Sequence, residues 1–187
     1  KTGVGMMKCK EVLTEANGDL DKAVVLLREK GLAAASKKSD RDAKDGRIFT
    51  CVSGANSAIL ELNCETDFVA NNDDFSQLGN DLIQYATDNG IQSKEQLEAA
   101  SINGESVSDL IAKYVLKIGE NIMVGQVDAF QSNACADYIH SNGKIGVLVE
   151  FSGAVDAALG RDIAMQVAAS SPRYVRPEDV ASDELEQ

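Results

Sequence analysis

Histidine, proline and tryptophan are scarce in this 187-residue sequence, which has one histidine, His140, two prolines and no tryptophan. Its four cysteines, Cys9, Cys51, Cys64 and Cys135, form no CxxC pair. A structural zinc site needs four closely grouped cysteine or histidine ligands, so this scatter predicts no metal site and no disulfide framework. Thiols of this kind are typical of a reducing compartment, and we expect the cytoplasm, or an organelle matrix or stroma.

Long apolar runs are also missing. No run approaches the roughly 18 residues that a membrane-spanning helix needs, and no signal-peptide pattern opens the chain. Hydrophobic residues make up 44% and charged residues 26%, as in an ordinary globular protein. The sequence contains neither a glycine-rich phosphate loop nor a Ser/His/Asp grouping. We therefore predict a protein that is not an enzyme, has no cofactor and does not bind membranes.

Positive charge is absent between Arg47 and Lys94, and the net charge of the chain is −12. Residues 1–46 hold 10 Lys/Arg and 8 Asp/Glu, whereas the remainder holds 8 and 22. Such an acidic surface repels a phosphate backbone, so direct nucleic-acid binding is not expected. A protein partner with basic residues fits this charge better.

Residues 1–46 predict a small helical module and a linker. Apolar residues recur at helical spacing and stop at Asn17-Gly18; they are Met6, Cys9, Val12, Leu13 and Ala16. Asp19 is a candidate cap for a second helix, which we expect to end at Gly31. Two short helices bury little surface, so a third is expected around 32–38 or before residue 1. The polar residues 36–46 then form the linker.

The rest of the chain predicts an α+β core with antiparallel hairpins, divided into a first half (47–130) and a second half (131–187). Strands are expected at 48–52, 58–62, 121–130 and 145–151, and helices after Phe75, over 93–100, over 108–119 and over 155–170. Aligning Gly54 with Gly143 superimposes two similar strands at an offset of 89, while the helices that follow align at 81. The first half therefore has eight more residues between strand and helix.

This extension contains Thr66, Asp67 and Phe68, and in the second half the Phe68 position is met by Ala157. Residues there are candidates for binding because loops present functional side chains. Asp67 and Glu65 could form an acid/base pair, or a calcium site together with Asp73 and Asp74. The better interpretation is that these acidic residues stabilise the following helix by interacting with its N-terminal dipole, since the glycine and final glutamate of a calcium loop are missing. Phe68 is either a core residue or an exposed one.

Two motifs in the right order carry a family resemblance. Residues 2–31, TGVGMMKCKEVLTEANGDLDKAVVLLREKG, and 63–75, NCETDFVANNDDF, resemble the N-terminal module and the TDFV signature of translation elongation factor Ts. The likeness extends through KIGENI (117–122) and 139–151 to RPEDV (176–180). The chain departs from the family at Lys8 and at Gly125-Gln126. It also stops at 181–187, where family members commonly continue, so it is either a short member or a fragment.

The resemblance implies a three-helix, ubiquitin-associated (UBA)-like module and a guanine-nucleotide exchange factor for elongation factor Tu. By the same resemblance, an exchange wedge disturbs the Mg²⁺ and phosphate site of that GTPase, and two further segments bind it. The wedge is Thr66, Asp67, Phe68 and Val69; the docking turn is His140, Ser141, Asn142 and Gly143; the N-terminal contact is Gly3, Val4, Gly5, Met6 and Met7. The alternative is an adaptor, in which the helical module binds a peptide and the core is a scaffold.

Overall fold

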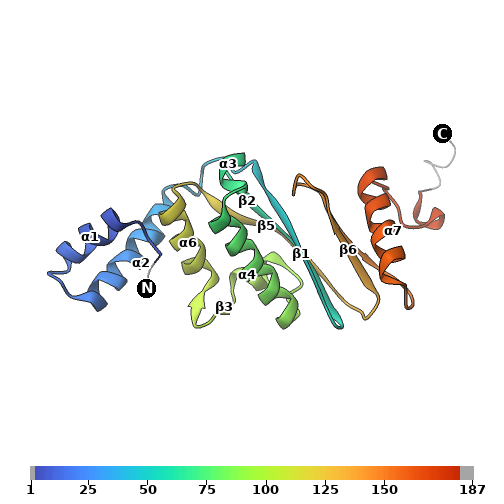
Figure 1. The fold of residues 1–187 in the computed structure, drawn as a ribbon, viewed down its shortest axis with the longest axis horizontal. Helices are drawn as coiled ribbons and strands as arrows, with labels where there is room; N and C mark the ends of the chain where they lie inside the picture. Colours follow the sequence, from blue (N-terminus) through green and yellow to red (C-terminus); the bar gives the residue numbers. More distant parts are fainter. Residues whose placement is uncertain (1–2, 182–187) are drawn as a thin grey trace.

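The computed structural model describes residues 3–181, and its elements form successive layers (Figure 1). Helices α1 (Met6–Glu15) and α2 (Leu20–Ser36) lie at one end, followed by α6 (Val107–Ile118) and α4 (Asp73–Asn89). A three-stranded sheet, a two-stranded hairpin and α7 (Ala157–Ser170) come next. The predicted α+β class is therefore confirmed.

Helix α1 ends, and helix α2 begins, where local signals predicted. Helix α1 is followed by Asn17 and Gly18, both in the left-handed region (φ 53° and 82°). The Asp19 carboxylate then caps α2, accepting hydrogen bonds from the backbone N–H groups of Asp21 and Lys22, each at 3.1 Å. Their apolar faces meet in a small core that includes Val12 and Leu27.

The expected end of α2 at Gly31 and a third helix over 32–38 are wrong. Helix α2 continues through Gly31 to Ser36, because this glycine faces another helix rather than ending its own. A Cβ at Gly31 would lie 3.3 Å from the carbonyl oxygen of Ala112 in α6, so its absence permits a close helix crossing. Helices α1 and α2 bury their apolar faces partly against Leu116 of α6. The UBA-like character of the module stays a prediction.

The main sheet has the antiparallel order β1-β2-β5, formed by β1 (Asp45–Ser53), β2 (Asn56–Cys64) and β5 (Ile122–Gln131). β1 and β2 make the predicted hairpin, with Gly54 at φ 60° in its turn. One face of the sheet packs on the apolar side of α4 and forms the main core, where Leu60, Leu62 and Phe75 are fully buried. Since β1 begins at Asp45, the connection from α2 is shorter than the predicted linker.

Short elements connect α4 to β5. They are α5 (Lys94–Glu98), β3 (Ser101–Ile102), β4 (Glu105–Ser106) and then α6. Ser93 caps α5 by accepting from the backbone N–H of Gln96 at 3.3 Å, at the start of the helix expected over 93–100. Helix α6 ends at Gly119, whose φ of 95° is the left-handed conformation that favours glycine.

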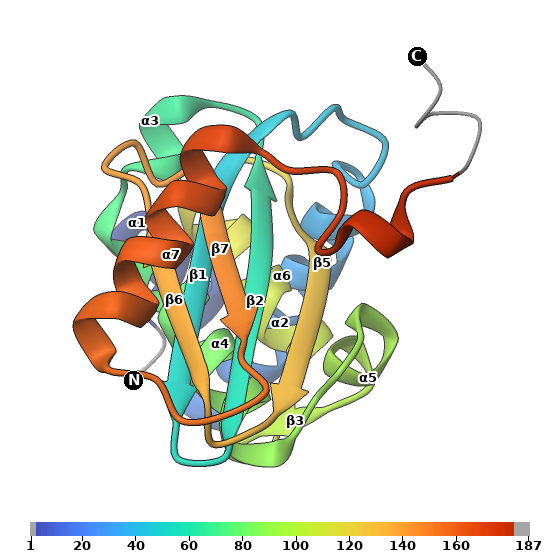
Figure 2. The ribbon, with the colours of Figure 1, turned by 90° about the vertical axis from the view of Figure 1, so that its right-hand side faces the viewer.

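The second hairpin, β6 (Cys135–Ile139) and β7 (Gly146–Glu150), covers the other face of the main sheet, and α7 covers the hairpin (Figure 2). A short 3-10 helix, η1 (Pro177–Asp179), follows. The Thr50 hydroxyl donates to the Asp137 carboxylate at 2.5 Å between the sheet and the hairpin. These contacts fix the second half of the core against the first.

The two hairpins carry their helices at corresponding points. A glycine lies at each crossing: Gly79 of α4 sits against the Phe49 ring of β1, and Gly160 of α7 against the Ala136 methyl of β6. Within the hairpins, the strand partners of Phe49 and Ala136 are 89 residues apart, which is the offset seen in the sequence. A side chain at either glycine would push helix and hairpin apart.

Candidate partner-binding site

Phe68 projects from the protein rather than into its core. It lies in a single helical turn, α3 (Asp67–Ala70), which occupies the extension of the first half, and its exposed fraction is 84%. Ala70 in the same turn is buried, and Val69 is half-buried. The interpretation of Phe68 as a core residue is therefore wrong. A large exposed aromatic on a short ordered element is a feature of binding surfaces.

Two consecutive caps fix the corner that carries Phe68. The Thr66 hydroxyl oxygen caps α3, accepting from the backbone N–H of Val69 at 3.4 Å. Six residues later the Asn72 side chain caps α4, accepting from the backbone N–H of Asp74 at 2.8 Å. The turn between them is closed by Asn71, whose amide donates to the Asp67 carbonyl at 2.8 Å. These local hydrogen bonds order the backbone of the turn that carries Phe68.

The carboxylates around α3 do not share a common partner. The Glu65 carboxylate pairs with Arg41 at 3.4 Å and accepts from the backbone N–H of Asn121 at 2.7 Å. Asp74 pairs with Lys117 of α6 at 2.6 Å, while the Asp67 side chain is exposed. Within residues 3–181, no group of three or more His, Cys, Asp or Glu side chains could hold a metal ion. The structure therefore offers no observation in favour of the calcium interpretation.

A buried cysteine lies directly beneath the corner. The Cys64 thiol donates to the Thr66 carbonyl at 3.2 Å, and burial raises the pKa of this thiol to about 12, with the negative charge of Glu120 as a smaller cause. Cys64 is therefore a neutral hydrogen-bond donor at neutral pH and has a structural role. The other three cysteines, all within the described part of the chain, are half-buried thiols.

The second predicted segment, His140 to Gly143, is a turn between β6 and β7 that is held by hydrogen bonds. The Gly143 carbonyl accepts from the backbone N–H of Ile48 at 2.8 Å, and the His140 ring contacts the Tyr138 hydroxyl at 3.1 Å. His140, Ser141 and Asn142 are exposed, whereas Gly143 is buried. Only the turn's outer side chains are therefore available to a partner.

This turn and α3 lie at the same edge of the molecule (Figure 2). Lys144, next to the turn, pairs with Asp45 at 2.8 Å. Asp45 is in turn the strand partner of Cys64, two residues before Thr66. The structure thus brings together two segments more than 70 residues apart in sequence, and one partner surface could contact both.

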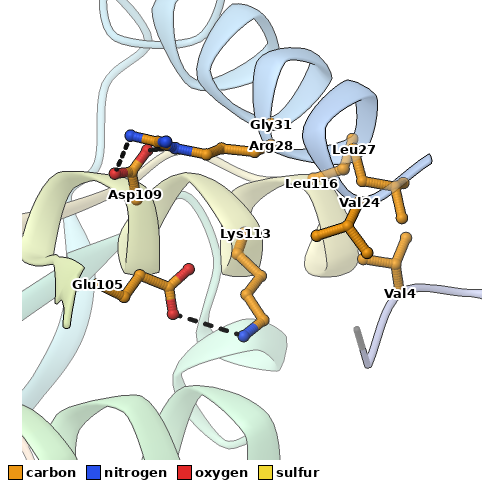
Figure 3. A pocket seen from close by; sticks show the side chains of 9 residues that line it. All are labelled: Val4, Val24, Leu27, Arg28, Gly31, Glu105, Asp109, Lys113 and Leu116. Atoms are coloured by element: carbon orange, nitrogen blue, oxygen red, sulfur yellow. Dashed lines mark hydrogen bonds and ion pairs between the residues drawn. The ribbon is translucent and has the colours of Figure 1, made fainter. Parts of the chain in front are cut away.

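The third predicted segment is not part of that edge. Gly3, Val4 and Gly5 precede α1, which lies at the far end of the molecule from α7 (Figure 1). Met6 and Met7 start α1 with exposed fractions of 85% and 77%. Val4 is half-buried and faces a cavity of about 150 Å³ between α2 and α6 (Figure 3). Exposed methionines adapt easily to different apolar partners.

Sequence reasoning missed two sets of residues that hold these segments. One is the ion pair between Arg28 of α2 and Asp109 of α6 beside the cavity (Figure 3). The other is the turn Gly119–Asn121, which contacts the residues before α3. Neither leaves a local signal, because each contact joins residues more than 50 positions apart.

Comparison with known proteins shows which family the chain resembles. The family model described as elongation factor TS matches residues 65–187. The chain is 44% identical over 186 residues to elongation factor Ts of Deinococcus deserti and 42% identical to elongation factor Ts of Deinococcus radiodurans. Both alignments cover 100% of this chain and 70% of the relative. The fold thus defines a two-hairpin α+β protein with exposed apolar residues on its helices. The chain belongs to the elongation factor Ts family.

No helix among the described residues is long and apolar enough to cross a membrane.

Proposed function

We propose that this protein is a guanine-nucleotide exchange factor that binds elongation factor Tu and promotes GDP release without itself being an enzyme. The observation that carries the proposal is Phe68, an aromatic side chain exposed on a capped corner beside the exposed carboxylate of Asp67. Family membership supports it. The proposed setting is the compartment in which translation takes place, in the cytoplasm or in an organelle.

The mechanism follows from how such GTPases hold their nucleotide. Much of the binding passes through Mg²⁺ and a phosphate-binding loop, which need close oxygen ligands in a fixed geometry. An inserted aromatic ring displaces those ligands without any covalent step, and a nearby carboxylate competes for the groups around the ion. In the proposed complex, Phe68 and Asp67 perform these roles, with Thr66 and Val69 holding the turn.

Binding of factor and nucleotide must then oppose each other. Whatever factor the protein removes from the affinity for GDP, GDP removes from the affinity for the protein. A wedge therefore weakens both ligands in the ternary complex. The turn His140 to Gly143 and the N-terminal residues Gly3 to Met7 supply affinity in this proposal, and the N-terminal module is UBA-like.

The test uses elongation factor Tu loaded with fluorescent GDP. Adding the protein at saturating concentration should speed GDP release strongly, and Phe68→Ala should remove most of this acceleration. Val175→Ala, which shortens another highly exposed apolar side chain, is the matched control and should behave like the wild type. An adaptor would bind a partner but leave GDP release unchanged, and that result would refute the proposal.

A further inference from the structure

Glu120, in the turn that follows α6, binds Thr66, the residue that caps α3. One carboxylate oxygen of Glu120 accepts from the backbone N–H groups of Glu65 at 3.1 Å and Thr66 at 3.0 Å. The other oxygen accepts from the Thr66 hydroxyl at 2.6 Å. Three donors thus converge on one half-buried carboxylate. Hydrogen bonds to a charged acceptor are stronger than those between neutral groups.

The hydrogen bonds to Glu120 determine how Thr66 caps α3. A hydroxyl has a single proton, and here it points to Glu120, so a lone pair of the oxygen is left for the backbone N–H of Val69. The Thr66 carbonyl is held as well, by Cys64 Sγ and by the backbone N–H of Ala70. Every polar group of Thr66 therefore has a partner, and Phe68 follows it by two residues.

The same two segments are joined in the opposite direction. The Glu65 carboxylate accepts from the backbone N–H of Asn121, and the Asn121 amide donates to the Arg41 carbonyl at 3.0 Å. Lys38 donates to the Gly119 carbonyl. The chain between α2 and β1 is thus tied to the turn that holds Thr66. Asn121 is buried, so water competes weakly for these bonds.

We propose that Glu120 is a positioning residue for nucleotide exchange: it fixes Thr66, and through Thr66 it holds Phe68 in the direction that exchange requires. The inference rests on the proposed function and adds to it a residue that need not contact the partner. The negative charge matters, because all three groups facing Glu120 are donors. A glutamine offers only one acceptor oxygen, and its NH₂ group would face a donor.

The experiment compares Glu120→Gln with Glu61→Gln. Glu61 is also a half-buried carboxylate of the same core, but its hydrogen bond is to the Asn63 side chain at 2.8 Å. The first readout is hydrogen exchange at the Val69 amide, which reports on the cap directly. We expect faster exchange there in Glu120→Gln and no change in Glu61→Gln. Unchanged Val69 exchange in Glu120→Gln overturns the inference, whatever the release rates are.

The second readout is GDP release from elongation factor Tu at saturating factor and at a temperature where every variant is folded. Glu120→Gln should lower the maximal rate about ten-fold, as expected for a lost charged hydrogen bond. It should have no further effect in a Phe68→Ala background, because both changes act through the same ring. Glu120→Asp, which keeps the charge on a shorter side chain, should retain more of the rate than Glu120→Gln.

Failure of the inference and failure of the proposed function look different. If elongation factor Tu releases GDP as fast with Phe68→Ala as with the wild type, the proposed function is wrong. If Phe68→Ala is slow but Glu120→Gln is normal, or if the two effects multiply, the exchange factor stands and the positioning role is refuted.

Discussion

Arg28 and Asp109 form a two-point ion pair between α2 and α6, with Nε and a terminal nitrogen of the guanidinium each 2.8 Å from a carboxylate oxygen (Figure 3). The Asp109 side chain is only 8% exposed, and its second oxygen also accepts from the Ser106 hydroxyl at 2.6 Å. This pair and the close crossing at Gly31 fix the N-terminal helices to the core.

Removing the cation should destabilise the protein more than removing an exposed one. In Arg28→Met the Asp109 carboxylate keeps Ser106 but stays buried without its counter-charge, which is costly. Lys22→Met is the control, since Lys22 pairs with Asp19 at 3.5 Å on the open surface. Urea unfolding at pH 7 should show a clear loss of unfolding free energy for Arg28→Met and almost none for Lys22→Met. Equal losses would mean that the pair does not secure α2.

The same pair should make stability sensitive to acid. Hydrogen bonds from Arg28 and from Ser106 lower the pKa of Asp109 below its ordinary value of about 3.9. A carboxyl group with a lowered folded pKa stabilises the protein above its unfolded pKa, and this stabilisation disappears as the pH falls through the folded value. The stability difference between wild type and Asp109→Asn should therefore be constant near neutrality and shrink below about pH 4. Urea midpoints across that range measure it, and a constant difference would contradict the assignment.

Phe68 and Phe75 provide a matched pair, because they lie seven residues apart with opposite exposure. Phe75→Ala should cost about 3–5 kcal/mol of unfolding free energy, since it empties a fully buried site. Phe68→Ala should change it by no more than about 0.5 kcal/mol. Thermal melts and urea unfolding of both variants decide this. A large loss in Phe68→Ala would return the ring to the core and remove the proposed wedge.

The N-terminal methionines should supply affinity rather than speed. Replacing Met6 and Met7 by serine removes two exposed apolar side chains at the start of α1 without disturbing the α2–α6 contact. We expect weaker binding to elongation factor Tu, by roughly ten-fold if both act as ordinary interface residues, and an unchanged maximal rate of GDP release. Leu20→Ser, at an exposed site in the same module, is the control. A lower maximal rate at saturation would show that the module acts on the nucleotide.

The turn between β6 and β7 should govern how long the complex lasts. His140→Ala removes an exposed ring while leaving the backbone bond from Ile48 to Gly143 in place. The dissociation rate should rise several-fold, about what one interface side chain contributes, whereas Gln166→Ala on the exposed face of α7 should have no effect. Surface-bound elongation factor Tu would report both rates. An unchanged rate for His140→Ala would leave the turn with a purely structural role.

The local features of this protein could be predicted from its sequence. Asp19, Ser93 and Gly119 mark helix ends because their hydrogen bonds or φ angles involve only neighbouring residues. The β1–β2 hairpin follows in the same way from alternation and a glycine turn. The TDFV motif could be found through its resemblance, since a contiguous motif needs no knowledge of the fold.

Features that depend on residues far apart in the chain could not be predicted in this way. Gly31 satisfies the local rule for a helix end, yet it lies inside α2 because a second helix crosses there. Phenylalanine is usually buried, yet the Phe68 ring is exposed because the extension holds it away from the core. The contact between Glu120 and Thr66 has no local signal, because the two residues are 54 positions apart in the chain and meet only when β5 pairs with β2. Local rules sum energies over a few neighbouring residues, whereas these positions are set by packing between segments that the chain brings together on folding.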